Sequence, residues 1–303
     1  MLSILGHAKG FDDPWVGHRT LNRLGLHAFR TRLAATAVAL RRRAARATRD
    51  DWTEALARDG FVVVPDLLAP EEHRAVRRDV RARLEAAERA HPPPPPPSGS
   101  GFGGKMPFEG GFDRYDGATL NRFLDIEDAA APPYAAFLHE PRVRTLCRAA
   151  IGRPPAPGKL QIYLTRHGHG EADPQTSLHK DTFHASLKYW YAVEAVEPRQ
   201  GPFAYVPGSH RMTSRRMAWE RERAARAAGL AAGGTPEDRG GSFRIEESEL
   251  AALDLPPPVS VPVAANTLVL ADTLGFHRRG RAEPGTERVA LYGWNRPWPF
   301  APL

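Results

Sequence analysis

The chain has 303 residues, of which 42% are hydrophobic and 25% charged, as is typical of a soluble globular protein with a substantial core. The net charge of +7 comes from Arg, much of it near the N-terminus, and could suggest a polyanionic partner. An Arg-rich, Ala-rich and Pro-rich composition can also reflect coding bias, so nucleic-acid binding is not expected. A single cysteine, Cys147, excludes an intrachain disulfide. No run of 18 apolar residues and no signal-peptide pattern is present, so we expect no membrane span and a cytoplasmic location.

Residues 1–51 are predicted to be a basic helical extension. Residues 17–50 have helical spacing, with Leu among Ala and Arg. Two interpretations stay open: an apolar stripe packs the helix on the main domain, or the basic helix docks on an anionic surface. The main domain is expected over residues 52–303.

The domain begins with a helix, a strand and a second helix. A short helix is expected to end at Gly60, and the β-branched run 61–64 predicts a strand. The run Pro70-Glu71-Glu72 begins a helix that extends to about Ala90. The Pro/Gly-rich stretch 91–104 is predicted to be an exposed loop.

The second half of the chain has the pattern of a β-protein with flanking helices. Short apolar runs separated by Pro and Gly predict antiparallel strands in a sandwich or jelly-roll barrel. These runs cover residues 159–165, 186–196, 202–206, 259–263, 267–271 and 289–294. An insertion at about residues 211–258, helical over 215–228, is expected to be either a lid or a solvated decoration.

A His-x-Asp pair at His179 and Asp181 is the first chemical signal. Alternate residues of an extended segment project to one face, so both side chains could bind one metal ion. His277 follows a strongly β-forming run and could supply a third ligand. Two His and one carboxylate with open positions opposite are typical of non-haem Fe(II) oxygenases. Arg288, eleven residues later, could pair with a carboxylate.

Several landmarks occur together and in order: Asp59 to Leu68 (DGFVVVPDLL), the His-x-Asp pair, Gly201 to Arg211 (GPFAYVPGSHR), and the distal His and Arg. With them, the chain over about residues 52–298 resembles the phytanoyl-CoA dioxygenase family of Fe(II)/2-oxoglutarate oxygenases. The resemblance implies a double-stranded β-helix in which His179, Asp181 and His277 bind iron.

The resemblance also implies a cosubstrate site. Arg288 would pair with the distal carboxylate of 2-oxoglutarate, and Trp190, Gln161 and Thr165 would line its pocket. Simple core packing is an equal alternative for Trp190. Arg279 stands where some members have a small hydroxyl residue, which leaves the hydrogen bonding of the pocket open.

The expected reaction is hydroxylation, or a related oxidation, of a C–H bond in a small-molecule substrate by O2, with a role in secondary metabolism as one setting. The carboxylate of Asp181 favours hydroxylation over halogenation, because related halogenases lack it. Two other functions stay open: a non-catalytic β-barrel that binds a small molecule, and an interaction protein that acts through its basic helix.

Overall fold

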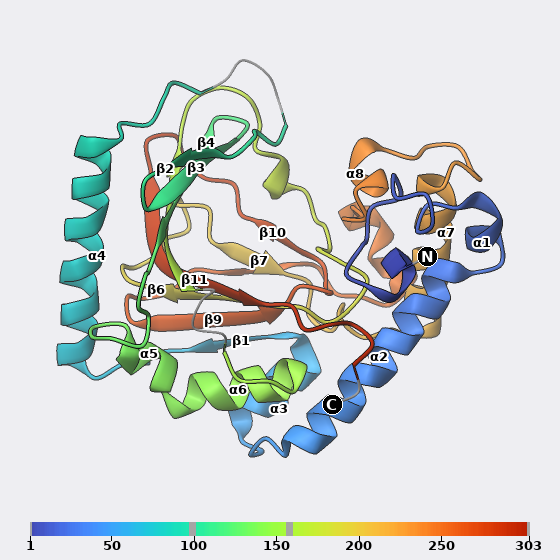
Figure 1. Ribbon diagram of the computed structural model, residues 1–303, viewed down its shortest axis with the longest axis horizontal. Helices are drawn as coiled ribbons and strands as arrows, with labels where there is room; N and C mark the ends of the chain where they lie inside the picture. Colours follow the sequence, from blue (N-terminus) through green and yellow to red (C-terminus); the bar gives the residue numbers. More distant parts are fainter. Residues whose placement is uncertain (1, 97–100, 156–159, 302–303) are drawn as a thin grey trace.

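Two antiparallel sheets face each other across a cavity in the computed structural model, which describes residues 2–96, 101–155 and 160–301 (Figure 1). The larger sheet has the order β1-β9-β6-β11-β5-β4-β3-β2, and the smaller has the order β10-β7-β8. This arrangement confirms the predicted class, mainly β with flanking helices and a double-stranded β-helix core. The strands are β1 Phe61–Val64, β2 Met106–Phe108, β3 Gly111–Asp116, β4 Thr119–Asp125, β5 Leu160–His167, β6 Leu187–Ala192, β7 Phe203–Tyr205, β8 Val259–Val261, β9 Thr267–Asp272, β10 His277–Arg279 and β11 Glu287–Asn295.

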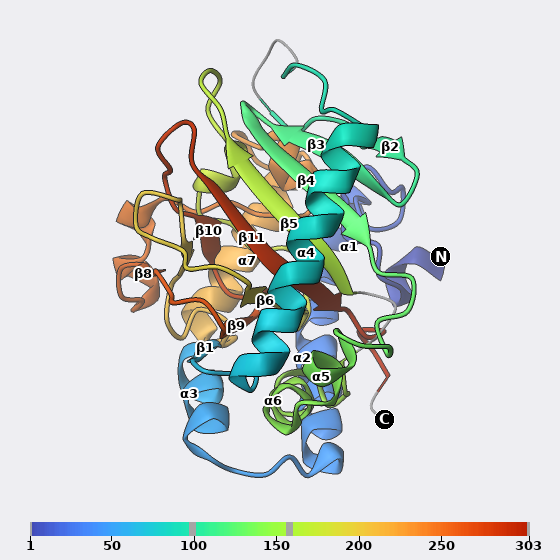
Figure 2. The same cartoon turned by 90° about the vertical axis from the view of Figure 1, so that its left-hand side faces the viewer.

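Helices cover the outer face of the large sheet and form a separate lobe beside it (Figures 1 and 2). The α-helices are α1 Arg19–Arg23, α2 Leu26–Ala45, α3 Asp51–Asp59, α4 Pro70–Ala90, α5 Ala135–His139, α6 Pro141–Ile151, α7 Ser214–Ala227 and α8 Pro236–Arg239. Short 3-10 turns occur at Leu2–Leu5, Pro174–Thr176, Glu247–Glu249 and Ala251–Leu253.

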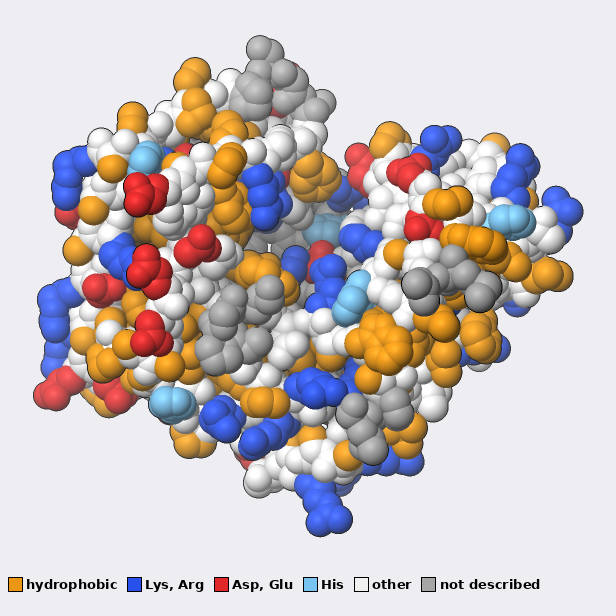
Figure 3. All heavy atoms as spheres, viewed as in Figure 1, with side chains coloured by type: hydrophobic (Ala, Val, Ile, Leu, Met, Phe, Trp, Pro, Cys, Tyr) orange, Lys and Arg blue, Asp and Glu red, His pale blue; other side chains and the backbone are white. Residues whose placement is uncertain are grey.

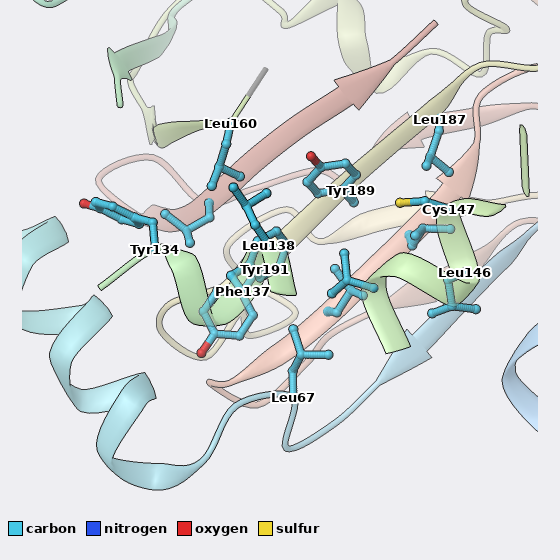
Figure 4. Packing of buried hydrophobic residues seen from close by; sticks show 14 of the residues in the cluster. Leu67, Tyr134, Phe137, Leu138, Leu146, Cys147, Leu160, Leu187, Tyr189 and Tyr191 are labelled. Atoms are coloured by element: carbon cyan, nitrogen blue, oxygen red, sulfur yellow. The ribbon is translucent and has the colours of Figure 1, made fainter. Parts of the chain in front are cut away.

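The alternation of side chains along β5, β6 and β11 separates the core from the cavity. Leu and Tyr residues on one face pack under α3, α4, α5 and α6, where Leu160, Tyr189 and Phe137 lie together (Figure 4). Residues between them in sequence, such as Thr165 and Trp190, point to the other face and line the cavity. Burial of one apolar face therefore fixes which residues are presented to the cavity.

The lobe has its own small core, built from the N-terminal segment, α7 and the loops around the smaller sheet. Phe11, Trp219, Phe243 and Phe276 belong to this core. The extension and the insertion thus pack together next to the cavity, and α2 also contacts α6. The boundary predicted at residue 51 stays a prediction.

The predicted helices over residues 17–50, 52–60, 70–90 and 215–228 correspond to α1 and α2, α3, α4 and α7. Four residues of the predicted Pro/Gly-rich loop, 97–100, and Lys159 of the first predicted strand lie outside the described residues. In the part of the chain that the structure describes, none of the helices is long and apolar enough to span a membrane.

Candidate metal centre and its cavity

Backbone hydrogen bonds bring the two halves of the candidate metal centre together. His179 and His277 form an isolated antiparallel bridge, in which each backbone N–H donates to the carbonyl of the other at 3.0 and 2.9 Å. The N–H of Asp181 donates to the carbonyl of Thr273 at 2.9 Å. Residues almost one hundred positions apart in sequence therefore project toward one point.

Both imidazole rings are oriented by their own loops. Nδ1 of His179 lies 2.8 Å from the carbonyl oxygen of Ser177, and Nδ1 of His277 lies 2.9 Å from that of Gly275. A carbonyl only accepts, so Nδ1 carries the proton in each ring and Nε2 keeps a free lone pair. This is the tautomer that a metal ligand through Nε2 needs, with the backbone carbonyl as its outer support.

The three ligand atoms are close enough for one ion. His179, Asp181 and His277 are buried, and each offers an atom within 4.8 Å of the others. Oδ1 of Asp181 lies 3.8 Å from Nε2 of His277, while Oδ2 forms an ion pair with Nζ of Lys188 at 2.7 Å. One carboxylate oxygen thus faces the histidines, and the other is held by a lysine that also lines the cavity.

The protonation states suit metal binding. Burial lowers the pKa of His179 well below 6.5, with His277 adding to the effect, and burial also lowers the pKa of His277. Burial alone would raise the pKa of Asp181, but Lys188 and the two histidines outweigh it and hold that pKa well below 3.8. At neutral pH the cluster therefore presents two neutral imidazoles and one carboxylate, the forms that coordinate.

The cluster opens into a cavity of about 200 Å³ between the two sheets. In the space-filling view, Lys and Arg side chains gather in a hollow between the β body and the lobe (Figure 3). An aromatic wall of Phe123, Tyr163, Tyr292 and Trp190 lines the large-sheet side. Tyr163 stacks on Phe123 with ring centroids 4.4 Å apart and planes 6° apart, and Tyr292 contacts both Tyr163 and Trp190.

Arg288 and Thr165 are cross-strand partners on β11 and β5, and both line this cavity. The Arg288 guanidinium donates to the carbonyl of Gly201. Burial, with nearby Arg279 adding to its effect, lowers the pKa of Arg288 to about 10. The hydroxyl of Thr165 is buried without a hydrogen-bond partner among the described residues. A buried cation beside an unpaired hydroxyl is a site suited to a carboxylate.

The other two residues expected in the cosubstrate pocket differ in position. Trp190 lines the cavity and also stacks on Phe203 at 4.8 Å, so it serves packing as well. Gln161 is not among the lining residues; its side-chain amide donates to Asp125 at 2.7 Å. The structure therefore brings Trp190 to the candidate site, whereas the Gln161 side chain on β5 is bonded to Asp125 of β4 instead.

Arg279 occupies the position of the expected small hydroxyl, and its guanidinium has three hydrogen-bond partners. It donates to the carboxylate of Asp173, to Oδ1 of Asn121 at 2.7 Å and to the Tyr163 hydroxyl oxygen at 2.9 Å. Burial would lower the pKa of Arg279, but Tyr163, Asp173 and Asp116 together raise it. Arg279 thus joins the small sheet to β4 and β5 of the large sheet.

A buried ionic group lies directly behind the His-x-Asp pair. Lys180, between the two ligands, donates to Oε2 of Glu220 on α7 at 2.6 Å, and both side chains are fully buried. The same carboxylate contacts His27 of α2 at 2.8 Å and Arg216 of α7 at 3.0 Å. Arg216 in turn donates to the carbonyl of Leu274 at 3.1 Å, three residues before the distal ligand.

A second contact reaches the ligand loop from the N-terminal segment. Nζ of Lys9 donates to the backbone carbonyl of Asp181 at 2.6 Å and to the Ser242 hydroxyl at 2.5 Å. Burial lowers the pKa of Lys9 to about 8 despite the nearby Asp181 carboxylate. Segments outside the β core therefore support the metal centre.

Sequence reasoning missed Lys188, Arg114, Glu220 and Lys9. Lys188 had a signal, because it alternates with Trp190 along a predicted strand and must face the same side. Glu220 and Lys9 had none, because a charged residue on a helix or in a loop is normally solvated.

Comparison with known proteins places these features in a family. The sequence model of the phytanoyl-CoA dioxygenase family matches residues 56–278, which include the three candidate ligands and end before Arg288. No curated protein matches the chain.

The solved structures that the chain matches include three proteins of low sequence identity. AviO1 from Streptomyces viridochromogenes Tue57 is 17% identical over 83% of this chain and 96% of its own, with a TM-score of 0.47. HygX from Streptomyces hygroscopicus, solved with nickel and 2-oxoglutarate bound, is 17% identical over 83% and 88%, with a TM-score of 0.45. The epimerase SnoN, in complex with Fe3+, alpha ketoglutarate and nogalamycin RO, is 19% identical over 82% and 85%, with a TM-score of 0.43.

The family model covers well over half of the chain, and the His-Asp-His cluster lies within the matched residues. The predicted enzyme class, an Fe(II)- and 2-oxoglutarate-dependent dioxygenase, is thereby confirmed. The chain belongs to the phytanoyl-CoA dioxygenase family.

Proposed function

We propose that this enzyme hydroxylates, or otherwise oxidises, a C–H bond of a small-molecule substrate, with His179, Asp181 and His277 as its iron ligands. The observation that carries the assignment is the convergence of these three buried side chains, with ligand atoms within 4.8 Å, at the edge of a cavity that also contains Arg288. Two histidines and one carboxylate leave open positions on an Fe(II) ion for cosubstrate and O2.

The residues present fit the iron. Each histidine has an unprotonated Nε2, and Oδ1 of Asp181 faces the same point. When bound, Fe(II) and 2-oxoglutarate supply the oxidant that acts on the substrate C–H bond, with O2 consumed. The protein holds the ligands in place before the metal arrives, and Lys188 restrains the carboxylate oxygen that faces away from the histidines.

Arg288 and Thr165 would bind the cosubstrate. The buried guanidinium would bind the distal carboxylate of 2-oxoglutarate, and the unpartnered Thr165 hydroxyl would donate a further hydrogen bond. Trp190 would then cover the carbon chain between this carboxylate and the metal. Gln161 would act only indirectly, by holding β4 and β5 together through Asp125.

The protonation states of the three candidate ligands disfavour the non-catalytic alternative. A β-barrel that only binds a ligand has no need for two imidazoles in the metal-binding tautomer beside an ionised carboxylate. The basic-helix alternative is weakened by α2, where Arg30 and Arg41 are buried and donate to backbone carbonyls. We place the reaction in the cytoplasm and in secondary metabolism. The role of residues 211–258 as a lid stays a proposal.

Binding of 2-oxoglutarate to the Ni(II)-loaded protein, measured by calorimetry, tests the assignment. We expect Arg288→Met to weaken binding by about 100-fold or more and Thr165→Val by about tenfold. Each variant removes a hydrogen-bond donor to the distal carboxylate of 2-oxoglutarate. Arg199→Met is the matched control, since Arg199 is an exposed arginine paired with Glu197. Wild-type affinity in Arg288→Met would contradict the proposal.

A further inference from the structure

Cationic residues line the cavity, and no Asp or Glu is found among its described lining residues. The cationic residues are Arg114, Lys188, Arg278, Arg279 and Arg288. The carboxylates Asp116 and Asp173, which pair with Arg114 and Arg279, do not belong to this lining, so a ligand in the cavity would contact the cations rather than the acids.

Three of the five cationic residues already have a proposed role or a set of partners. Arg288 is assigned to the cosubstrate, Lys188 holds Asp181, and the guanidinium of Arg279 is shared among Asp173, Asn121 and Tyr163. Arg278 lies between His277 and Arg279 on β10, so its side chain points away from the large sheet, toward Glu247 of the insertion. Arg114 of β3 therefore remains.

Arg114 is fixed by an ion pair, but one of its N–H groups has no hydrogen-bond partner among the described residues. Its Nη2 lies 2.8 Å from Oδ2 of fully buried Asp116, which fixes the guanidinium at the cavity wall. Its Nε is buried and has no hydrogen-bond partner among the described residues. A buried unpaired N–H of a charged group is costly, so an acceptor is expected at this position in the occupied enzyme.

We propose that the substrate is an anion with a flat or apolar body: a carboxylate or phosphate bound by Arg114, and a body lying along the aromatic wall. The wall of Phe123, Tyr163, Tyr292 and Trp190 offers the packing surface. A guanidinium binds either anion through paired N–H donors. This inference rests on the proposed function, because it takes Arg288 as the cosubstrate anchor.

Four size-matched probes test the substrate class on protein loaded with Ni(II) and saturating 2-oxoglutarate. The probes are 2-naphthylacetate, 2-naphthyl phosphate, 2-naphthylacetamide and 2-naphthylethylammonium, and the readout is the Kd of each by calorimetry. We expect at least one of the two anions to bind about tenfold or more tightly than the amide, and the ammonium to bind most weakly. The tighter anion identifies the head group.

The variant Arg114→Met should bring the Kd of the preferred anion to that of the amide and leave the amide and 2-oxoglutarate affinities unchanged. Arg199→Met is the control and should keep the preference. Equal binding of all probes, binding of none, or an anion preference that survives in Arg114→Met would overturn this inference. Because 2-oxoglutarate binding is measured on the same samples, its absence would count separately against the proposed function.

Discussion

At the residue scale, the two ligand histidines differ from surface histidines in their protonation. Burial places the pKa of both rings below the ordinary value of 6.5. Protons compete with the metal for Nε2, so affinity is lost only as the pH falls through the lowered pKa. We expect the Kd for Co(II) to stay nearly constant from pH 8 to 6.5 and to rise below that range. A steady loss of affinity from pH 7.5 downward would contradict this account.

Lys188 gives a second residue-scale prediction. Its ammonium group holds Oδ2 of Asp181 at 2.7 Å, and outer-shell contacts of this kind change metal affinity about 10–100-fold. Lys188→Met should therefore weaken Co(II) binding by about tenfold and alter its visible absorption spectrum. Lys188→Arg keeps the charge and should restore most of the affinity. If Lys188→Met keeps the wild-type affinity and spectrum, Lys188 does not position the carboxylate.

At the scale of elements, the buried ionic group joins α2, α7 and the His-x-Asp loop. Glu220 is fully buried between Lys180 and Arg216. Burial alone would raise the pKa of Glu220, but Lys180, His27 and Arg216 outweigh it and lower that pKa. The stabilisation is present above the ordinary pKa of 4.5 and is lost as the pH falls below it.

Glu220→Gln should lower the free energy of unfolding by about 3–5 kcal/mol at pH 7, because it leaves two buried cations without a counter-charge. Glu222→Gln on the same helix removes an exposed ion pair with Arg226 and should cost about 0–1 kcal/mol. Denaturant unfolding monitored by circular dichroism measures both. Equal effects of the two variants would rule out a special role for the buried group.

Some strands and helices could be predicted from the sequence, and others could not. Strands with an alternating apolar face, such as β5, β6 and β11, were predicted because one face must be buried. The hairpin β3–β4 was missed: its inner positions carry Arg114, Asn121 and other polar residues, which obscure the apolar alternation. Helices α5 and α6 were missed as well. Strand β10 has only three residues, His-Arg-Arg, which carry no β pattern of their own.

The candidate ligands could be predicted because their chemistry and spacing are local. The residues that support them could not, because the supporting contacts join distant segments. Lys9 reaches Asp181 across 172 positions, and Arg279 reaches Asn121 across 158. Such pairs follow from tertiary packing, which leaves no mark at either position in the sequence.

At the scale of the whole molecule, residues of both the lobe and the β core hold the metal centre in place. Glu220 from the insertion and Lys9 from the N-terminal segment both support the loop that contains the His-x-Asp pair. Deleting Arg215–Gly241 would remove Glu220, the ion-pair partner of Lys180. We therefore expect the deletion to weaken Co(II) binding as well as turnover. A deletion variant that binds metal normally but has no turnover would instead identify the insertion as an independent lid.

The central claim is that His179, Asp181, His277 and Arg288 form one Fe(II)/2-oxoglutarate site. Its most direct test is the visible charge-transfer absorption that develops when Fe(II) and 2-oxoglutarate are added to the protein without oxygen. We predict that wild type develops the band, that His277→Ala does not, and that Arg288→Met develops it only at much higher 2-oxoglutarate concentration. Absence of the band in wild type, or an unchanged band in His277→Ala, would contradict the account.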